Sequence, residues 1–216
     1  YRALNTRDLP EILERGGMPP DEILAVRSVA AVLPFRTNRH VLGLIDWDNV
    51  PEDPIYQLTV PQPGMLDTSD LKRMSRLLAS DAPQGEIKAA AHDIRMSLNP
   101  HPSGQMTANI PMLDGEQLAG MQHKYPETVL FFPAQGQTCH AFCTYCFRWP
   151  QFVDEPELKM KSNKVDTLQE YVSNHSEVSD VLITGGDPMI MSADRMEGIV
   201  APLLDIDHLE SIRFGS

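Results

Sequence analysis

The chain has 216 residues, of which 42% are apolar and 22% charged, so it is long enough to bury a core and has the composition of a globular protein. The net charge of −12 argues against a nucleic-acid partner, because phosphate binding requires clustered Lys and Arg. No apolar run approaches the roughly 20 residues that span a bilayer, and no secretory signal is present. We therefore expect no membrane partner and a cytoplasmic location. Because the chain begins at Tyr1 and not at Met, we expect it to be processed, to have lost a tag, or to be cut from something longer.

The part from 1 to 120 has the pattern of a mainly helical, proline-interrupted region. The patterns predict one helix capped by Asp21 that ends before Pro34, a second from Thr68, and a third over 86–98. Proline-rich connections separate these segments, at 51–54, 61–64 and 99–102. We therefore expect this region to wrap over something rather than to form a regular bundle.

From 121 to 216 the pattern alternates between strands and helices. Strands are predicted at 129–132, 181–184 and 212–214, and helices at 165–175 and 192–204. Such alternation implies parallel strands joined by right-handed crossovers, hence an α/β fold. Three strands do not complete a barrel, so we expect the first half of a barrel or open sheet, within the N-terminal portion of a larger protein.

All three cysteines of the chain, Cys139, Cys143 and Cys146, lie within eight positions. An odd, clustered set does not suit a disulfide framework and is typical of metal ligands in a reducing compartment. Three thiolates on a [4Fe–4S] cluster leave one iron open to chelate the amino and carboxylate groups of S-adenosylmethionine (SAM). Two alternatives stay open: a zinc site with His140 as fourth ligand, and three structural thiols.

The spacing Cys-x-x-x-Cys-x-aromatic-Cys, with Tyr145 as the aromatic residue, is the radical SAM signature. The surrounding sequence resembles the N-terminal portion of the lysine 2,3-aminomutase-like family of that superfamily. The resemblance extends from about 120 to 216 and is carried by the segments His123–Pro126, Cys146–Arg148, Asp180–Pro188 and Ile212–Ser216. Before residue 120 the likeness is slight.

The resemblance implies a partial radical SAM (β/α) barrel with the cluster in the loop after the first strand. It implies that the three cysteines hold the cluster, that Arg148 pairs with a substrate carboxylate, and that a further set helps to bind SAM: Tyr145, Gly185, Gly186 and Asp187. Two glycines let the backbone approach a ligand closely, although Gly-Gly can also be a simple turn and Asp187 can cap a helix. Trp149-Pro150 departs from the arginine-rich sequence usual in the family.

Family members also use pyridoxal phosphate (PLP). Lys124 stands where relatives place an arginine near the cofactor phosphate, and Thr128 replaces another arginine. The lysine that forms the aldimine lies in the family's C-terminal portion, outside this chain. PLP binding is therefore left open. His123 is interpreted as a packed or hydrogen-bonded histidine rather than a functional one.

The implied activity is that of an isomerase: a 5′-deoxyadenosyl radical is generated from SAM and drives a 1,2-amino shift on an amino acid or related amine. The alternatives are a PLP-independent radical SAM dehydrogenase, epimerase or other rearrangement, and a non-catalytic iron–sulfur or zinc protein. The resemblance further implies a small-molecule substrate and an electron donor such as flavodoxin or ferredoxin, and it leaves a homo-oligomer open.

Overall fold

The computed structural model describes residues 2–216, which divide into two compact units. The first unit comprises the chain up to Pro100 together with His140–Trp149, and the second comprises His101–Cys139 and Pro150–Ser216. This division differs from the boundary near residue 120 expected from the sequence. The reason is that the segment after Pro100 leads into a hairpin and a strand of the second unit's sheet. Each unit is described by itself.

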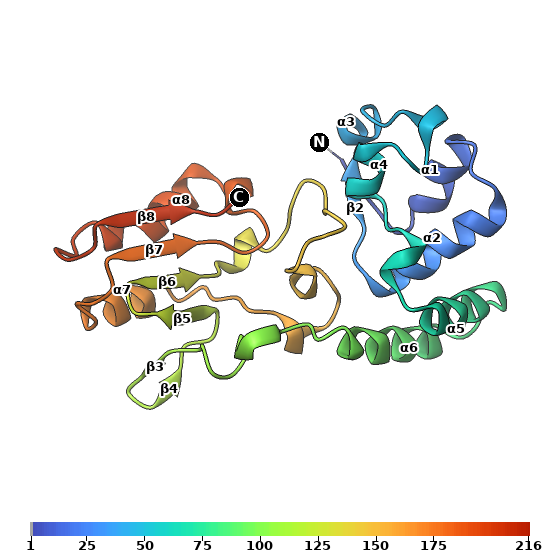
Figure 1. Ribbon diagram of the computed structural model, residues 1–216. Helices are drawn as coiled ribbons and strands as arrows, with labels where there is room; N and C mark the ends of the chain where they lie inside the picture. The colour runs from blue at the N-terminus through green and yellow to red at the C-terminus, as the bar shows by residue number, and fades with distance from the viewer. Residues whose placement is uncertain (1) are drawn as a thin grey trace. The chain divides into compact units, whose positions relative to one another are not determined.

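The first unit is mainly helical, with one small antiparallel ladder (Figure 1). Its elements are β1 (Ala3–Asn5), α1 (Leu9–Arg15), α2 (Pro20–Val32), β2 (Arg36–Asn38), α3 (Arg39–Leu42), α4 (Pro54–Thr59), α5 (Thr68–Ala79) and α6 (Gln84–Ser97). Strands β1 and β2 pair in antiparallel register, with Leu4 opposite Thr37. The three predicted helices are confirmed as α2, α5 and α6.

Two details of the helix prediction are wrong. The N-cap position of α2 is Pro19, and Asp21 lies inside its first turn, because Pro20 at the first helical position already has the required φ. Gly85, expected to precede the third helix, lies within α6. The short helices α1, α3 and α4 and the β1–β2 ladder were not predicted, because segments this short carry little periodicity.

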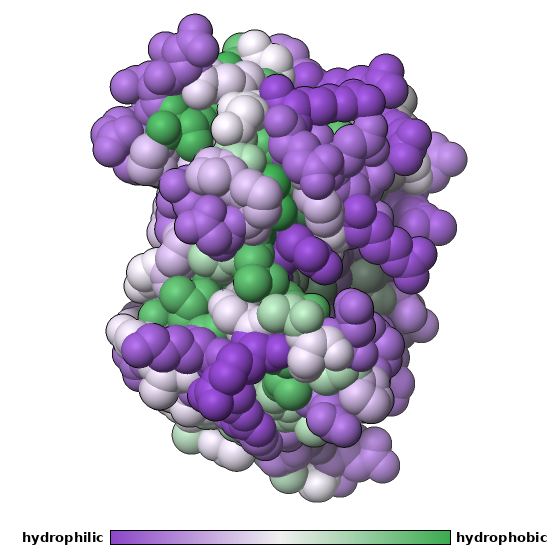
Figure 2. Space-filling model, turned by 90° about the vertical axis from the view of Figure 1, so that its right-hand side faces the viewer, coloured by the Kyte–Doolittle hydropathy of each residue, from purple (hydrophilic) through white to green (hydrophobic). Residues whose placement is uncertain are grey.

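Amphipathic packing holds the first unit together. Val29 and Val32 of α2 are fully buried against Met74 of α5 and Ile94 of α6. A second apolar cluster joins α1 to the other side of α2 through Leu9, Leu13 and Val26, among others. The face that these helices turn outward is mainly hydrophilic, with smaller hydrophobic areas between the polar side chains (Figure 2). The unit therefore has its own core.

The second unit is built on a four-stranded sheet in the order β5-β6-β7-β8 (Figure 1). Its elements are the hairpin β3 (Met112–Leu113) and β4 (Glu116–Gln117), β5 (Met121–Tyr125), β6 (Thr128–Phe131), α7 (Val165–Ser173), β7 (Asp180–Ile183), α8 (Ala193–Val200) and β8 (Ser211–Phe214). The predicted parallel pairing of β6, β7 and β8 is confirmed. The sheet is nevertheless mixed, because the unpredicted strand β5 pairs antiparallel with β6.

Both crossover helices pack on the same face of this sheet. Alternate residues of β6 and β7 are completely buried there, namely Val129, Phe131, Val181 and Ile183. They share one core with Leu168 and Val172 of α7, Ile199 of α8 and Leu203 just beyond it. The 3-10 turn Ala201–Leu203 follows α8, because Pro202 cannot continue the α-helical hydrogen bonding. The opposite face, with Leu130 and Leu182, is half-buried.

An ion pair joins the first residue of β7 to β8. Arg213 Nε of β8 donates to Asp180 Oδ1 of β7 at 2.7 Å, and a second bond joins Nη2 to Oδ2. The hydrogen bonds from Arg213 are the largest cause that lowers the pKa of Asp180. A carboxyl whose pKa is depressed by folding stabilises the folded state above its unfolded pKa, near 4, and this contribution disappears as pH falls through the folded pKa.

We expect Asp180→Asn to be less stable than the parent protein at pH 7. The difference should shrink as pH falls below about 4 and through the lowered folded pKa of Asp180, where the parent carboxyl becomes neutral as well. Urea unfolding of the two proteins between pH 3 and 7 measures this. A difference in the free energy of unfolding that stays constant over the whole range would exclude the ionic contribution.

Among residues 2–216, no helix combines the length and the apolar character needed to cross a membrane.

Candidate active site

The three cysteines lie on the segment that follows β6, called here the cysteine loop and defined as Phe132–Trp149. β6 ends at Phe131, the short 3-10 turn Ala134–Gly136 follows, and the loop closes where a second such turn begins at Trp149. In parallel α/β sheets, ligand sites lie beyond the carboxyl ends of the strands, and the loop begins at such an end. Cys139 belongs to the second unit, and Cys143 and Cys146 belong to the first.

None of the three cysteines forms a disulfide, and all three are half-buried. Cys143 and Cys146 share a tight turn in which the Cys146 N–H donates to the Cys143 carbonyl at 3.1 Å. Burial is the largest cause that raises the pKa of the Cys146 thiol, and Cys143 adds to it, while the backbone N–H and guanidinium of Arg148 act in the opposite direction. Metal ligation by such thiols requires deprotonation, so metal binding here would release protons.

The segment Gly185–Asp187 lies directly after β7 and is bonded to the beginning of the cysteine loop. The backbone N–H groups of Gly186 and Asp187 both donate to the Gly136 carbonyl at 3.1 Å. The Asp187 carboxylate accepts from the Met189 N–H at 2.9 Å and from the Ser216 hydroxyl at 2.8 Å. Asp187 therefore caps the turn Pro188–Ile190, as the sequence alternative suggested.

Both glycines are required by close approach. Gly185 has φ +146°, a conformation that residues with a side chain rarely adopt, and a Cβ there would overlap the Gln137 side chain. A Cβ on Gly186 would lie 2.5–2.8 Å from three backbone atoms of Thr138. Gln137 donates from Nε2 to the Pro133 carbonyl at 2.9 Å, while its buried Oε1 has no hydrogen-bond partner. The unpaired Oε1 is an acceptor suited to a ligand that carries N–H donors, as the amino group of SAM does.

The aromatic residues beside Cys146 project into solvent. Tyr145 is 77% exposed and Phe147 is 68% exposed, which is unusual for large aromatic side chains outside binding surfaces. Arg148 is half-buried, and its guanidinium lies 5.2 Å from the centroid of the Phe147 ring. Burial lowers the pKa of Arg148, and the neighbouring Cys146 opposes this. Arginine nevertheless stays charged at neutral pH, so Arg148 remains a cation next to the loop.

Lys124 is not brought together with these residues. It is exposed on β5 next to Tyr125, which pairs with Thr128 at the beginning of β6, whereas the cysteine loop follows the other end of β6. Its ammonium group lies 5.5 Å from the Tyr125 ring centroid. The neighbouring His123 bonds the Tyr171 hydroxyl at 2.7 Å and the Pro126 carbonyl at 3.1 Å, which confirms that it is a packed, hydrogen-bonded histidine.

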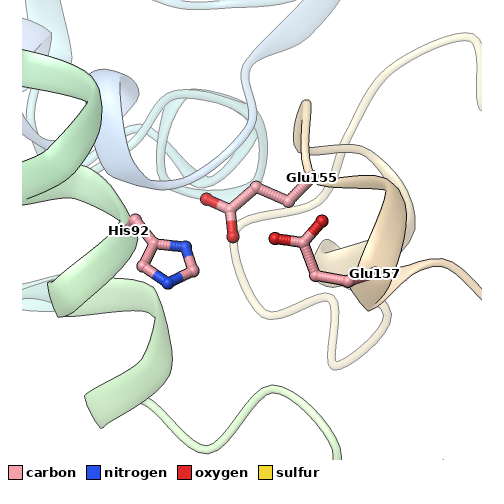
Figure 3. A group of neighbouring side chains, drawn as sticks. All are labelled: His92, Glu155 and Glu157. Carbon is pink, nitrogen blue, oxygen red and sulfur yellow. The ribbon is translucent and has the colours of Figure 1, made fainter. Parts of the chain in front are cut away.

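Two acidic side chains lie close together in the second unit. Glu155 is buried, with 7% of its surface exposed, and Glu157 is exposed beside it on the 3-10 turn Pro156–Leu158 (Figure 3). Figure 3 also labels His92, an exposed residue of α6 in the first unit. His92 and the two glutamates therefore belong to different units. Carboxylates are in any case not the soft ligands that an iron–sulfur cluster prefers.

No family model matches the chain. Curated proteins, however, match nearly all of it. A protein of Aquifex aeolicus named "Putative L-lysine 2,3-aminomutase" is 30% identical over 199 residues, which are 92% of this chain and 42% of that protein. The L-lysine 2,3-aminomutase of Acetoanaerobium sticklandii is 26% identical over 92% of this chain and 39% of its own length. That of Clostridium subterminale is 34% identical over 97 residues, 45% of this chain and 23% of its own.

The chain spans less than half the length of these curated relatives. The resemblance inferred from the cysteine spacing and the flanking segments is confirmed by these matches. The matched residues extend well before residue 120, where the sequence motifs showed only a slight likeness to the family. The chain is homologous to the L-lysine 2,3-aminomutases of the radical SAM family.

Proposed function

We propose that the protein to which this chain belongs is a radical SAM isomerase that catalyses an amino shift on an amino acid or related amine. The observation that carries the proposal is the hydrogen-bonded junction of two segments: the cysteine loop after β6 and Gly185–Asp187 after β7, joined at the Gly136 carbonyl. Homology to L-lysine 2,3-aminomutases supports the reaction class and a small amino-acid substrate.

The packing of both crossover helices on one face of the sheet supports the partial-barrel prediction. In a barrel all helices lie outside the strands, whereas an open doubly wound sheet has helices on both faces. The half-buried face with Leu130 and Leu182 would then line the interior. The ion pair of Asp180 with Arg213 lies on that same face, since both side chains alternate with the buried ones along β7 and β8.

In this proposal each group of residues has one task. Cys139, Cys143 and Cys146 would hold three irons of a [4Fe–4S] cluster. Gly185 and Gly186 would help to bind the amino end of SAM by letting Gln137 and Thr138 pack closely against them, and the Gln137 Oε1 would accept one of its N–H donors. A reduced cluster with SAM supplies a 5′-deoxyadenosyl radical that abstracts hydrogen from the substrate.

Tyr145, Phe147 and Arg148 would shape the rest of the pocket. An exposed aromatic ring directly before Cys146 is suited to stack on the adenine of SAM. The Arg148 guanidinium would accept a substrate carboxylate in the bidentate geometry that a planar fork provides. A flavodoxin- or ferredoxin-type electron donor and a cytoplasmic location remain part of the proposal.

PLP does not enter the mechanism. Lys124, the residue of this chain predicted to contact its phosphate, lies at the opposite end of β6 from the cysteine loop. We therefore derive no step through PLP, and the PLP-independent rearrangements stay as the second enzyme hypothesis.

The proposal is tested by EPR spectroscopy of the full-length protein, reconstituted anaerobically with iron and sulfide and then reduced. We expect a [4Fe–4S]⁺ signal whose g-values shift when SAM is added, because SAM reaches an iron that has no cysteine ligand. A cluster signal whose g-values do not change when SAM is added would favour the non-catalytic alternative and contradict the enzyme assignment. A protein that retains zinc and no iron would do the same.

A further inference from the structure

Residues 140–149 of the cysteine loop belong to the first unit and are hydrogen-bonded to its helical part, residues up to Pro100. The Phe142 N–H donates to the Arg36 carbonyl at 2.9 Å, and the Thr144 N–H donates to the Leu58 carbonyl at 2.8 Å. Two side chains add to these bonds. The Thr144 hydroxyl donates to the Gln57 carbonyl at 2.7 Å, and the Asn38 amide donates to the His140 carbonyl at 3.3 Å.

The acceptors belong to elements that exist without the loop. Gln57 and Leu58 are in the last turn of α4, where carbonyl groups have no partner within the helix and need a donor from elsewhere. Arg36 is in β2, whose pairing with β1 is independent of the loop. Asn38 is 8% exposed, and its Oδ1 caps α3 by accepting from the N–H groups of His40 and Val41.

These bonds hold both sides of Cys143. Phe142 and Thr144, its two neighbours in sequence, each donate a backbone hydrogen bond to the first unit. Downstream, Cys146 is linked to Cys143 by the turn described above, and the Trp149 N–H donates to the Cys146 carbonyl at 3.2 Å. The Trp149 side chain packs against the core that α2, α5 and α6 share. The backbone that carries two of the three thiols is thereby fixed by the first unit.

We propose that the first unit is the template of the cluster site: β2 and the C-terminal turn of α4 set the conformation of the Cys143–Cys146 turn before any metal is bound. Thr144 is the positioning residue, because it satisfies two orphan carbonyls of α4 with one residue. The importance of this template for catalysis rests on the proposed function. Its existence rests only on the hydrogen bonds of the loop and does not depend on the proposed function. It also gives a role to Trp149, where the sequence departs from its family.

The template is tested first in the full-length protein without metal, by hydrogen exchange at single amides. In Thr144→Val the side chain keeps its shape and loses the hydroxyl. We expect the amides of Phe142, Cys146 and position 144 to exchange faster, on the order of 2- to 10-fold, the factor that corresponds to one net hydrogen bond. Thr144→Ser should restore slow exchange. Equal exchange in all three proteins would overturn the proposal.

Thr59→Val is the matched control. Thr59 is also on the α4 helix, and its hydroxyl donates to the Ile55 carbonyl of the same helix at 2.6 Å, so its loss does not touch the loop. Asn38→Ser makes a second test, since serine retains the α3 cap and is too short to reach the His140 carbonyl. We expect faster exchange at residues 140–144 in Asn38→Ser and parent-like exchange there in Thr59→Val.

The second readout is cluster retention in the reconstituted protein. Thr144→Val should lose iron to a chelator several-fold faster than the parent and than Thr59→Val, with recovery in Thr144→Ser. If the parent binds no iron, the proposed function fails, yet the exchange experiment still decides whether the template exists. If iron loss is equal in Thr144→Val and the parent, the template is not what positions the ligands.

Discussion

Replacement of Cys143 by alanine is expected to abolish binding of the [4Fe–4S] cluster while leaving the apo-protein folded. The chain contains three cysteines, all in the cysteine loop, so within this chain no other thiol can substitute. The loop is held near Cys143 by backbone bonds from Phe142 and Thr144 and not by the half-buried thiol itself. Iron analysis after reconstitution, together with far-UV circular dichroism of the apo-protein, measures the two effects.

His140→Ala is the control that separates iron from zinc. If three cysteines hold a cluster, His140→Ala should keep its iron and the SAM-dependent EPR change, because the loop is bonded through the His140 carbonyl, which alanine retains. If His140 is instead the fourth ligand of a zinc site, the variant should lose metal as Cys143→Ala does. Iron retained in Cys143→Ala would contradict the assignment of that residue as a ligand.

The second unit was the part of the fold most accessible from sequence. The apolar runs that became β6 and β7 are buried on one side and stop at Pro133 and at Gly185, so length and boundary residues identified them. The strand β5 is not predicted from the sequence, because its polar residues, including Gln122 and His123, interrupt the apolar alternation that is typical of a strand. Gln122 is 8% exposed, and its amide finds partners in the Gln105 carbonyl and the Met160 sulfur. Hydrogen bonds to residues far away in the chain, which allow a polar side chain to be buried, cannot be recognised from a short stretch of sequence.

The site shows the same limit. Cysteine spacing and the Gly-Gly pair could be read directly, because their chemistry resides in a few adjacent residues. Gln137 and Thr138 could not, since their importance comes from the closeness of two segments almost fifty residues apart in the chain. Asn38 and Thr144 were also missed: Asn and Thr are common in turns, and only the fold brings the α4 carbonyls to the loop. Lys124 was placed by resemblance, and strand register separates it from the loop.

Replacement of Gly186 by alanine is expected to destabilise the second unit and to disturb the contact between the cysteine loop and Gly185–Asp187. The new Cβ would lie 2.5–2.8 Å from the backbone N, C and O of Thr138, and backbone atoms cannot rotate away as a flexible side chain can. Overpacking of this kind costs about 1–3 kcal/mol in the free energy of unfolding. Relief requires the loop to move away from Gly185–Asp187, which would separate Cys139 from the segment proposed to bind SAM.

Gly198→Ala provides the matched control in the same unit. Gly198 is an exposed residue of α8 with nothing within 4 Å of an added Cβ, so alanine should stabilise the protein by about 0.5–1 kcal/mol through helix propensity. Urea unfolding gives both free energies, and EPR titration with SAM gives the affinity of each reconstituted variant. We expect Gly186→Ala to lower stability and weaken SAM binding, and Gly198→Ala to leave SAM binding unchanged. A Gly186→Ala protein with parent-like stability and SAM affinity would show that the contact between the two segments does not constrain the site.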